Sequence, residues 1–197
     1  MREQKIGIIG AGSWGTTLAN LLADKGFEVT LWVYEEELLQ KLQCMRCNTR
    51  YLPGITLNAA LRYTRSLKEA VYGKHVILWV TPSQVFRKLF SEALPFFPTE
   101  AIQVSASKGI ENESLKRLSE IAEEQNPAFR DRKFVVLSGP SFAMEVCRKL
   151  PTAVVVASRD RESAASIQEV MATPLLRIYT SQDIVGVELG GALKNVI

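Results

Sequence analysis

The sequence is poor in the features that mark several common classes of protein. Its 197 residues include one histidine and three cysteines. No apolar run approaches the roughly 18 residues of a membrane-spanning helix, and the longest runs, such as Val76–Val80, have the length of a strand. The apolar stretch near the N-terminus is short and interrupted by glycines, and it lacks the small-residue cleavage site of a signal peptide. We therefore expect a cytoplasmic protein without structural disulfides and without a membrane segment.

Strong charge and metal ligands are scarce as well. The net charge is only +3, and blocks of Lys or Arg interleaved with aromatic residues are absent, which argues against a nucleic acid partner. Cys44 and Cys47 form a CxxC pair, but a four-ligand zinc site would also need both Cys147 and His75. The pair follows a predicted helix, whereas a redox CxxC would follow a strand in a thioredoxin-like pattern. We predict no metal site, and the mild positive charge suits small anionic ligands.

Short β-rich runs alternate with amphipathic helical stretches along the chain. Several runs are continuously apolar, as in strands that are covered on both faces of a parallel sheet. The predicted strands are Lys5–Gly10, Glu28–Val33, Leu61–Thr64, His75–Val80, Ala101–Ser105, Lys133–Leu137, Thr152–Ala157 and Leu176–Tyr179. The predicted helices are Ser13–Lys25, Glu35–Gln43, Ser66–Val71, Ser83–Leu94, Glu113–Glu124 and Arg161–Met171. The alternation predicts an α/β fold with a doubly wound, mostly parallel sheet, in one domain over residues 1–181.

A glycine-rich turn follows the first predicted strand. It has the pattern GxGxxG, with Gly10, Gly12 and Gly15, and it leads into a helix and a second strand. In this context Gly10 permits the tight turn, Gly12 lets a pyrophosphate approach the backbone, and Gly15 lets helix and strand pack closely. The first N–H groups of the helix would bind the phosphates. We interpret the turn as a dinucleotide-binding site of the Rossmann type rather than a turn that binds nothing.

The end of the second strand bears on the choice between NAD and NADP. An acidic residue about 20 positions after the turn usually binds the ribose 2′-OH of NAD, and a nearby Arg accommodates the 2′-phosphate of NADP. Glu35 is placed for the first role, although a carboxylate is also favoured there by the dipole of the following helix. Arg46 and Arg50 come later in the chain. The sequence leaves the cofactor preference open.

Further polar residues follow later strands. Val80–Ser83, Ser105–Gly109 and Leu137–Ala143 each come directly after a predicted strand. Ligands of doubly wound sheets bind beyond the carboxyl ends of the strands. We therefore expect Lys108, Gly139 and Ser141 to lie in the ligand crevice, with His75 at the opposite end of its strand and in no catalytic role.

Seven motifs together resemble the bacterial NAD(P)-dependent glycerol-3-phosphate dehydrogenases, in the order of that family. They are GAGSWGT, the NxRYLPG stretch at Asn48–Gly54, VTPS, SKGIE, SGPSFAMEV, LPTAVVVAS and ELGGALKNV. Two departures are minor. Tyr34 stands where many members carry a basic residue, which leaves the contact with the adenine ribose open. His75 stands where a small or acidic residue is more usual.

The resemblance implies that the protein interconverts glycerol 3-phosphate and dihydroxyacetone phosphate with NAD or NADP, supplying the backbone of glycerophospholipids. It leaves open a homodimer of the full-length enzyme. By position, it implies a cofactor site of Gly10, Gly12, Ser13, Trp14, Gly15, Tyr34, Lys108 and Ala143. It implies substrate contacts from Lys108, Gly139, Ser141, Lys194 and Asn195, with Lys194 as the proton-transfer residue.

The chemistry of alcohol oxidation suits two lysines. Removing a hydride from a secondary alcohol also requires removing its hydroxyl proton. A lysine can accept this proton if burial and a neighbouring cation lower its pKa from about 10.4 to roughly 7–8. We expect this of Lys194, with Lys108 as the neighbouring cation and as a group that polarises the ketone oxygen. Taken alone, Lys194 would be read as a solvated lysine on a helix.

Two other functions are compatible with a dinucleotide site: a binding module without catalysis, such as a redox sensor, and another β-hydroxy dehydrogenase. The SGPSFA and GGALKN stretches and the two crevice lysines argue against both. The chain ends in VELGGALKNVI, inside an apolar helical stretch. Since members of the family continue as an all-helical domain, we expect residues 182–197 to be only its first helix. On this reading the chain is a fragment that binds cofactor and is itself inactive.

Overall fold

The computed structural model describes residues 4–130 and 133–194. Within these residues eight strands form one sheet in the order β3-β2-β1-β4-β5-β6-β7-β8. The strands are β1 (Lys5–Ile9), β2 (Glu28–Trp32), β3 (Arg62–Thr64), β4 (Val76–Trp79), β5 (Ile102–Ser105), β6 (Phe134–Ser138), β7 (Thr152–Ala157) and β8 (Leu176–Ser181). Neighbouring strands are parallel except for β6 and β7, which pair antiparallel. The predicted doubly wound, mostly parallel sheet is confirmed.

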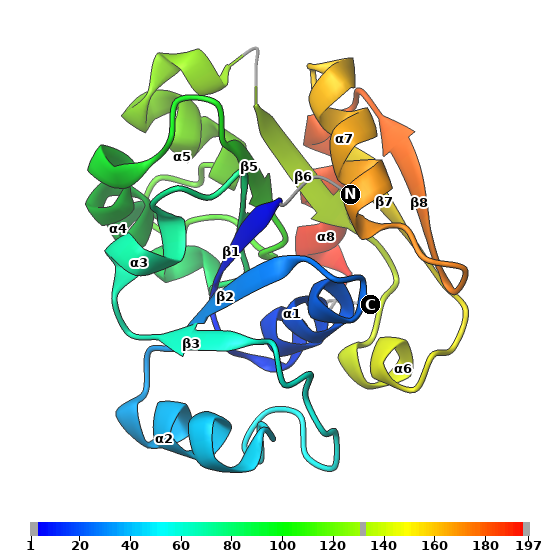
Figure 1. Ribbon diagram of the computed structural model, residues 1–197. Helices are drawn as coiled ribbons and strands as arrows, with labels where there is room; N and C mark the ends of the chain where they lie inside the picture. Colours follow the sequence, from blue (N-terminus) through cyan, green and yellow to red (C-terminus); the bar gives the residue numbers. More distant parts are fainter. Residues whose placement is uncertain (1–3, 131–132, 195–197) are drawn as a thin grey trace.

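Helices cover both faces of the sheet (Figure 1). The helices in the described residues are α1 (Ser13–Asp24), α2 (Glu36–Met45), α3 (Leu67–Val71), α4 (Ser83–Ala93), α5 (Leu118–Gln125), α6 (Ala143–Cys147), α7 (Arg161–Met171) and α8 (Ile184–Leu193), with 3-10 turns η1 (Leu94–Phe96) and η2 (Pro127–Phe129). From β1 to β6, and from β7 to β8, the helical connections return the chain to the same end of the sheet, so these strands run parallel. The connection through α6 does not, and β7 runs antiparallel to β6.

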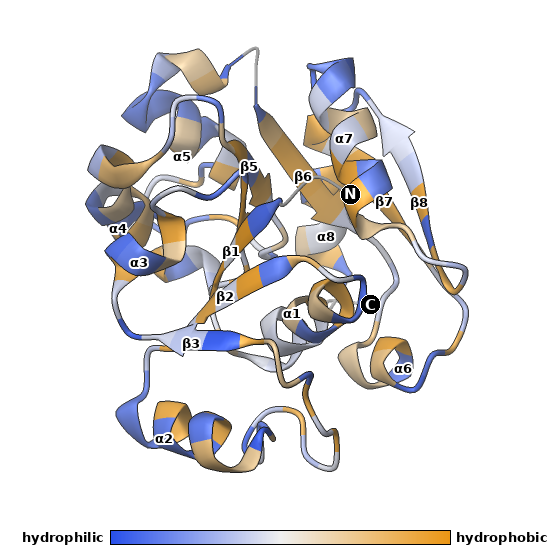
Figure 2. Ribbon diagram, in the orientation of Figure 1, coloured by the Kyte–Doolittle hydropathy of each residue, from blue (hydrophilic) through white to orange (hydrophobic). Residues whose placement is uncertain are grey.

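The core consists of two layers, one on each face of the sheet. Residues of β1 and β4 alternate between them, as the period of a strand requires. Ile6 and Ile8 pack with α1, α2 and α7, whereas Ile9 and Trp79 pack with α3, α4, α5 and α8. β6 is apolar along most of its length, as expected for a strand covered on both faces (Figure 2).

The register of the sheet brings the candidate site together. Ile9 at the end of β1 pairs with Trp32 of β2 on one side and with Trp79 of β4 on the other. Trp79 in turn pairs with Ser105 of β5. The segments that follow β1, β2, β4 and β5 therefore leave the sheet at the same edge.

The structure differs from the prediction at two helices. α5 begins at Leu118, five residues later than Glu113, where the sequence pattern placed its start. Glu111 is bound by Arg87 of α4, and Leu115 adopts a left-handed conformation with φ of 56°, which is incompatible with a helix through this stretch. The short helix α6 was not predicted, because a single turn of five residues is too short to show a periodic pattern.

None of the helices in the two described ranges has the length and apolar character needed to cross a bilayer.

Candidate functional site

The glycine turn after β1 has the geometry that a dinucleotide requires. Gly10 has φ of +117°, and an added Cβ would lie 2.4 Å from the carbonyl oxygen of Val80. At Gly15 a Cβ would lie 1.9 Å from the carbonyl oxygen of Gly10, so only glycine lets α1 pack against the turn. At Gly12, by contrast, a Cβ would meet no atom within 4 Å. The turn is closed on its packed side and open at Gly12, where a ligand can approach the backbone.

A buried asparagine fixes this turn from a distant part of the chain. The side-chain amide of Asn48 is fully buried and donates to the carbonyl oxygen of Ala11 and to Oγ1 of Thr16, both at 2.8 Å. Its Oδ1 accepts from the backbone N–H of Tyr51 at 2.9 Å. Sequence reasoning noted this stretch only as a family motif. The one available signal was the asparagine in that motif, and its bonds to Ala11 and Thr16, 37 and 32 positions away in the sequence, depend on the fold.

A cavity of about 440 Å³ lies at the carboxyl edge of the sheet, beside the glycine turn. Its lining includes eight of the residues predicted from the sequence, namely Gly12, Ser13, Trp14, Gly15, Lys108, Ser141, Ala143 and Lys194. Val80, Thr81 and Pro82, which follow β4, complete the wall between the glycine turn and Lys108. Five segments that are far apart in the sequence thus converge on one cavity.

The two lysines are neighbours in this cavity. Burial and the adjacent ammonium of Lys194 lower the pKa of Lys108 to about 8. The sequence analysis expected such a lowering for Lys194, with Lys108 as the neighbouring cation; the structure brings the two amino groups together, so the lowered pKa is a property of the pair. Because neighbouring groups lose their protons as a pair, the pair holds one readily released proton near physiological pH. This is the property expected of a proton donor and acceptor.

Lys194 is held by two groups of the segment after β6. Its Nζ donates to the carbonyl oxygen of Ser141 at 3.2 Å and lies 4.8 Å from the centre of the Phe142 ring. An ammonium over an aromatic face is stabilised by the charge distribution of the ring. Phe142 is 60% exposed and lines the cavity, although sequence reasoning did not select it. Its only sequence signal was its position between Ser141 and Ala143.

The other predicted substrate residues are Ser141, Gly139 and Asn195, of which only Ser141 lines this cavity among the residues that the structure describes. Ser141 is buried, whereas Gly139 lines a second cavity of about 450 Å³ next to Lys194. Gly139 has φ of +154°, and a Cβ there would lie 3.0 Å from Cα of Val154, so this glycine lets the turn pack on β7. Asn195, the last predicted substrate residue, lies outside the described residues.

The end of β2 carries a cluster of three side chains. Oε1 of Glu35 accepts from the hydroxyl of Tyr51 at 2.7 Å and lies 3.8 Å from a guanidinium nitrogen of Arg50. The hydrogen bond to Glu35 raises the pKa of Tyr51. Tyr34 is 71% exposed and lies outside the cavity lining. Arg46, the other basic residue considered from the sequence, ends α2 in a left-handed conformation.

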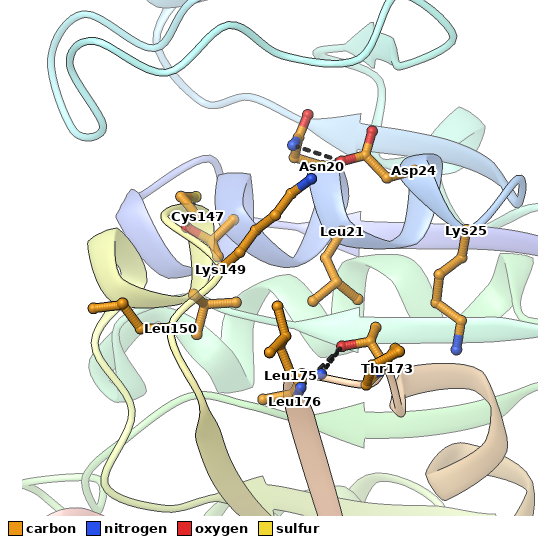
Figure 3. Close-up of a pocket in the computed structure, with 13 residues that line it drawn as sticks. Asn20, Leu21, Asp24, Lys25, Cys147, Lys149, Leu150, Thr173, Leu175 and Leu176 are labelled. Atoms are coloured by element: carbon orange, nitrogen blue, oxygen red, sulfur yellow. Dashed lines mark hydrogen bonds between the residues drawn. The ribbon is translucent and has the colours of Figure 1, made fainter.

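A separate cavity of about 320 Å³ lies farther along α1 (Figure 3). Leu21 of α1 faces Leu175 and Leu176 at the start of β8, and Asn20, Asp24 and Lys149 lie at its border. It contains none of the predicted site residues. The three cysteines are free thiols, and no group of three or more His, Cys, Asp or Glu in the part of the chain that the structure describes could hold a metal ion. Nδ1 of His75 accepts from the backbone N–H of Lys5, at the amino end of β1.

Residues 5–164 match the family described as the NAD-dependent glycerol-3-phosphate dehydrogenase N-terminus. A glycerol-3-phosphate dehydrogenase [NAD(P)+] of Geobacter metallireducens is 52% identical over 194 residues, which cover 98% of this chain and 58% of that protein. The enzyme of the same name from Geobacter sulfurreducens is 52% identical over 195 residues, which cover 99% of this chain and 58% of that protein.

A crystal structure of glycerol-3-phosphate dehydrogenase from Coxiella burnetii superimposes with a TM-score of 0.91 at 35% identity. The match covers 98% of this chain and 58% of that chain. The chain thus spans somewhat more than half the length of the relatives that it matches.

Proposed function

The chain belongs to the family of NAD-dependent glycerol-3-phosphate dehydrogenases, and we propose that the protein transfers a hydride between NAD(P) and the pair glycerol 3-phosphate and dihydroxyacetone phosphate. Its role would be to supply the backbone of glycerophospholipids. The observation that carries the proposal is that Lys108 and Lys194, from distant segments, line one cavity with the glycine turn. A binding module without catalysis would have no use for this pair.

The residues of the turn suit a dinucleotide. The open space at Gly12 leaves room for a pyrophosphate against the backbone. The N–H groups in the first turn of α1 have no carbonyl partner within the helix, and they would bind the phosphate oxygens. Ser13, Trp14 and Ala143 would border the cofactor, since they line the same cavity. When bound, the nicotinamide supplies or accepts the hydride.

The two lysines would take part in transfer of the hydroxyl proton. During oxidation a neutral amine takes the hydroxyl proton of the alcohol, and during reduction an ammonium returns it. We assign this transfer to Lys194, which Ser141 and Phe142 hold at the border of both cavities. Lys108 would donate a hydrogen bond to the ketone oxygen and stabilise the negative charge that develops there. Gly139, Ser141 and Asn195 would contact the rest of the substrate.

The test is turnover in full-length protein carrying Lys194→Ala. We expect turnover to fall by at least ~10²-fold, the usual contribution of general acid–base catalysis, while cofactor affinity changes little. Lys88→Ala serves as the matched control, because Lys88 on α4 is 80% exposed and lies outside the cavity. Near-normal turnover in the Lys194 variant would remove this residue from the reaction.

We also propose that α8 begins the helical substrate domain that the family resemblance implies, with the boundary after residue 181. In support, Val185, Leu189 and Leu193 lie four residues apart on α8 and expose 42%, 42% and 56% of their surface. Such a stripe is typical of a helix that packs against further helices. The free thiols favour the cytoplasm as the location. A homodimer of the full-length enzyme stays an expectation.

A further inference from the structure

Helix α8 carries a buried carboxylate that the reaction described above does not use. The side chain of Glu188 is only 7% exposed. Its carboxylate accepts from the backbone N–H of Ser119 at 2.9 Å, from the hydroxyl of Ser119 at 2.6 Å, and from the guanidinium of Arg117 at 2.9 Å. Burial raises the pKa of Glu188, and these donors act against the rise. A buried carboxylate is costly unless it is bonded in this way.

The bonds join the two segments that carry the lysines. Glu188 precedes Lys194 by six residues, or about 9 Å along a helix at 1.5 Å per residue. Arg117 and Ser119 lie at the start of α5, where the connection from β5 that contains Lys108 ends. The Ser119 N–H belongs to the first turn of α5, where a carboxylate is favoured by the unpaired N–H groups and by the helix dipole.

Little else anchors α8. Besides the Glu188 side chain, only Ile184 and Gly191 of its ten residues are buried, and Val187 packs partly against the core. Gly191 packs so closely on β6 that an added Cβ would lie 2.5 Å from Oγ of Ser138. That contact sets how near α8 lies to the sheet, but glycine has no side chain to prevent the helix from sliding. The charged bonds of Glu188 are directional, and they fix the position of α8 relative to α5.

We propose that Glu188 is a positioning residue, which holds Lys194 at its working separation from Lys108 by fastening α8 to the start of α5. The proposal rests on the proposed function, because it concerns the same lysine pair. The other charged group at the cluster is Glu120, which pairs with Arg117 at 3.0 Å and keeps that guanidinium in place. A displacement of about 1 Å can reduce a catalysed rate up to 10²-fold, so a loosened α8 should slow the reaction without touching the cofactor site.

The test compares Glu188→Ala and Glu188→Gln in the full-length enzyme. Glu123→Gln is the matched control, since Glu123 also lies on α5 and binds Arg159 at 2.8 Å, but it makes none of these bonds to α8. We expect Glu188→Ala to lower kcat by about 10- to 100-fold with little change in KM for the cofactor. We expect Glu188→Gln to recover part of the loss, because its amide oxygen still accepts from the Ser119 N–H.

The pH profile separates positioning from a general loss of stability. Moving Lys194 away from Lys108 removes the charge repulsion that helps lower the pKa of Lys108 to about 8. The basic limb of the kcat profile should therefore shift upward in both Glu188 variants and stay in place in the control. An unchanged profile together with kcat within about twofold of wild type would overturn the proposal. If Glu188→Ala does not fold, the pH profile of kcat for Glu188→Gln tests the proposal by itself. If Lys194→Ala is itself near-normal, the proposed function has failed, whatever the Glu188 variants show.

Discussion

A substitution at Gly12 should separate cofactor binding from folding. In Gly12→Val the new side chain enters open space, since an added Cβ meets no atom within 4 Å. The backbone at Gly12 has φ of −67° and an extended ψ of −177°, which valine adopts without strain. Because valine is a poor residue at a helix N-cap, we expect a loss of at most about 1 kcal/mol in the free energy of unfolding. The fold should persist.

The effect on the cofactor should be much larger. The valine side chain would occupy the space through which the pyrophosphate reaches the N–H groups at the start of α1. A hydrogen bond to a charged group contributes about 1.5–3 kcal/mol. Losing two such bonds would cost about 3–6 kcal/mol, and each 1.4 kcal/mol corresponds to a tenfold change in affinity. We therefore expect the Kd for NADH to rise by ~10²-fold or more.

Gly15→Ala is the informative comparison, because in this variant the stability of the fold should fall, whereas in Gly12→Val the affinity for the cofactor should fall. An added Cβ at Gly15 would lie 1.9 Å from the carbonyl oxygen of Gly10, so α1 would have to shift. Overpacking of this kind costs about 1–3 kcal/mol of stability. Calorimetric titration with NADH and thermal unfolding of both variants provide the two readouts. Unchanged cofactor affinity in a folded Gly12→Val protein would refute the site assignment.

Two further predictions concern the pH dependence of the reaction rates and the preference between NAD and NADP. As pH rises through about 8, the pKa of Lys108, ketone reduction should slow and alcohol oxidation should accelerate, because reduction needs the protonated lysine pair and oxidation needs a neutral amine. Initial rates in both directions test this, and profiles that are flat across that pH contradict it. Glu35→Gln should improve the Kd for NADP relative to NAD by ~10-fold, since it removes a carboxylate that would repel the 2′-phosphate. Tyr51→Phe, which keeps that charge, is the control, and equal Kd ratios in the two variants would contradict the role of Glu35.

Much of the fold could be read from the sequence because its determinants are local. Strands covered on both faces need continuous apolar runs, and the alternation of these runs with helical patterns leaves few topologies other than a parallel sheet. The turn from Gly10 to Gly15 could also be read, since Gly15 is required by a contact within the turn and Gly10 by a contact with the segment after the adjoining strand, while Gly12 leaves room for a ligand. The same regularity predicted that Lys108, Gly139 and Ser141 would lie at the carboxyl edge; Lys108 and Ser141 line one cavity, and Gly139 lines the neighbouring one.

Other features depend on contacts between residues that are far apart in the chain. The sequence pattern extended α5 back to Glu113, because it contained no sign that Arg87 of α4 would bind Glu111. The lowered pKa of Lys108 depends on its burial and on the nearby Lys194, and both follow from the packing of distant segments, so the sequence could suggest the pair but not its environment.

The sequence by itself determined the class of fold, the glycine turn and eight of the residues that line the cavity, because each is encoded in a periodic pattern or a short motif. Only the tertiary structure decided how those residues are held: Asn48 on Ala11, Phe142 against Lys194, and Glu188 on Ser119. The partners in these contacts are 37, 52 and 69 residues apart in the sequence. The reason is physical. A hydrogen bond or a ring contact requires its partners within a few ångströms, and for distant residues the packing of the whole sheet sets that distance.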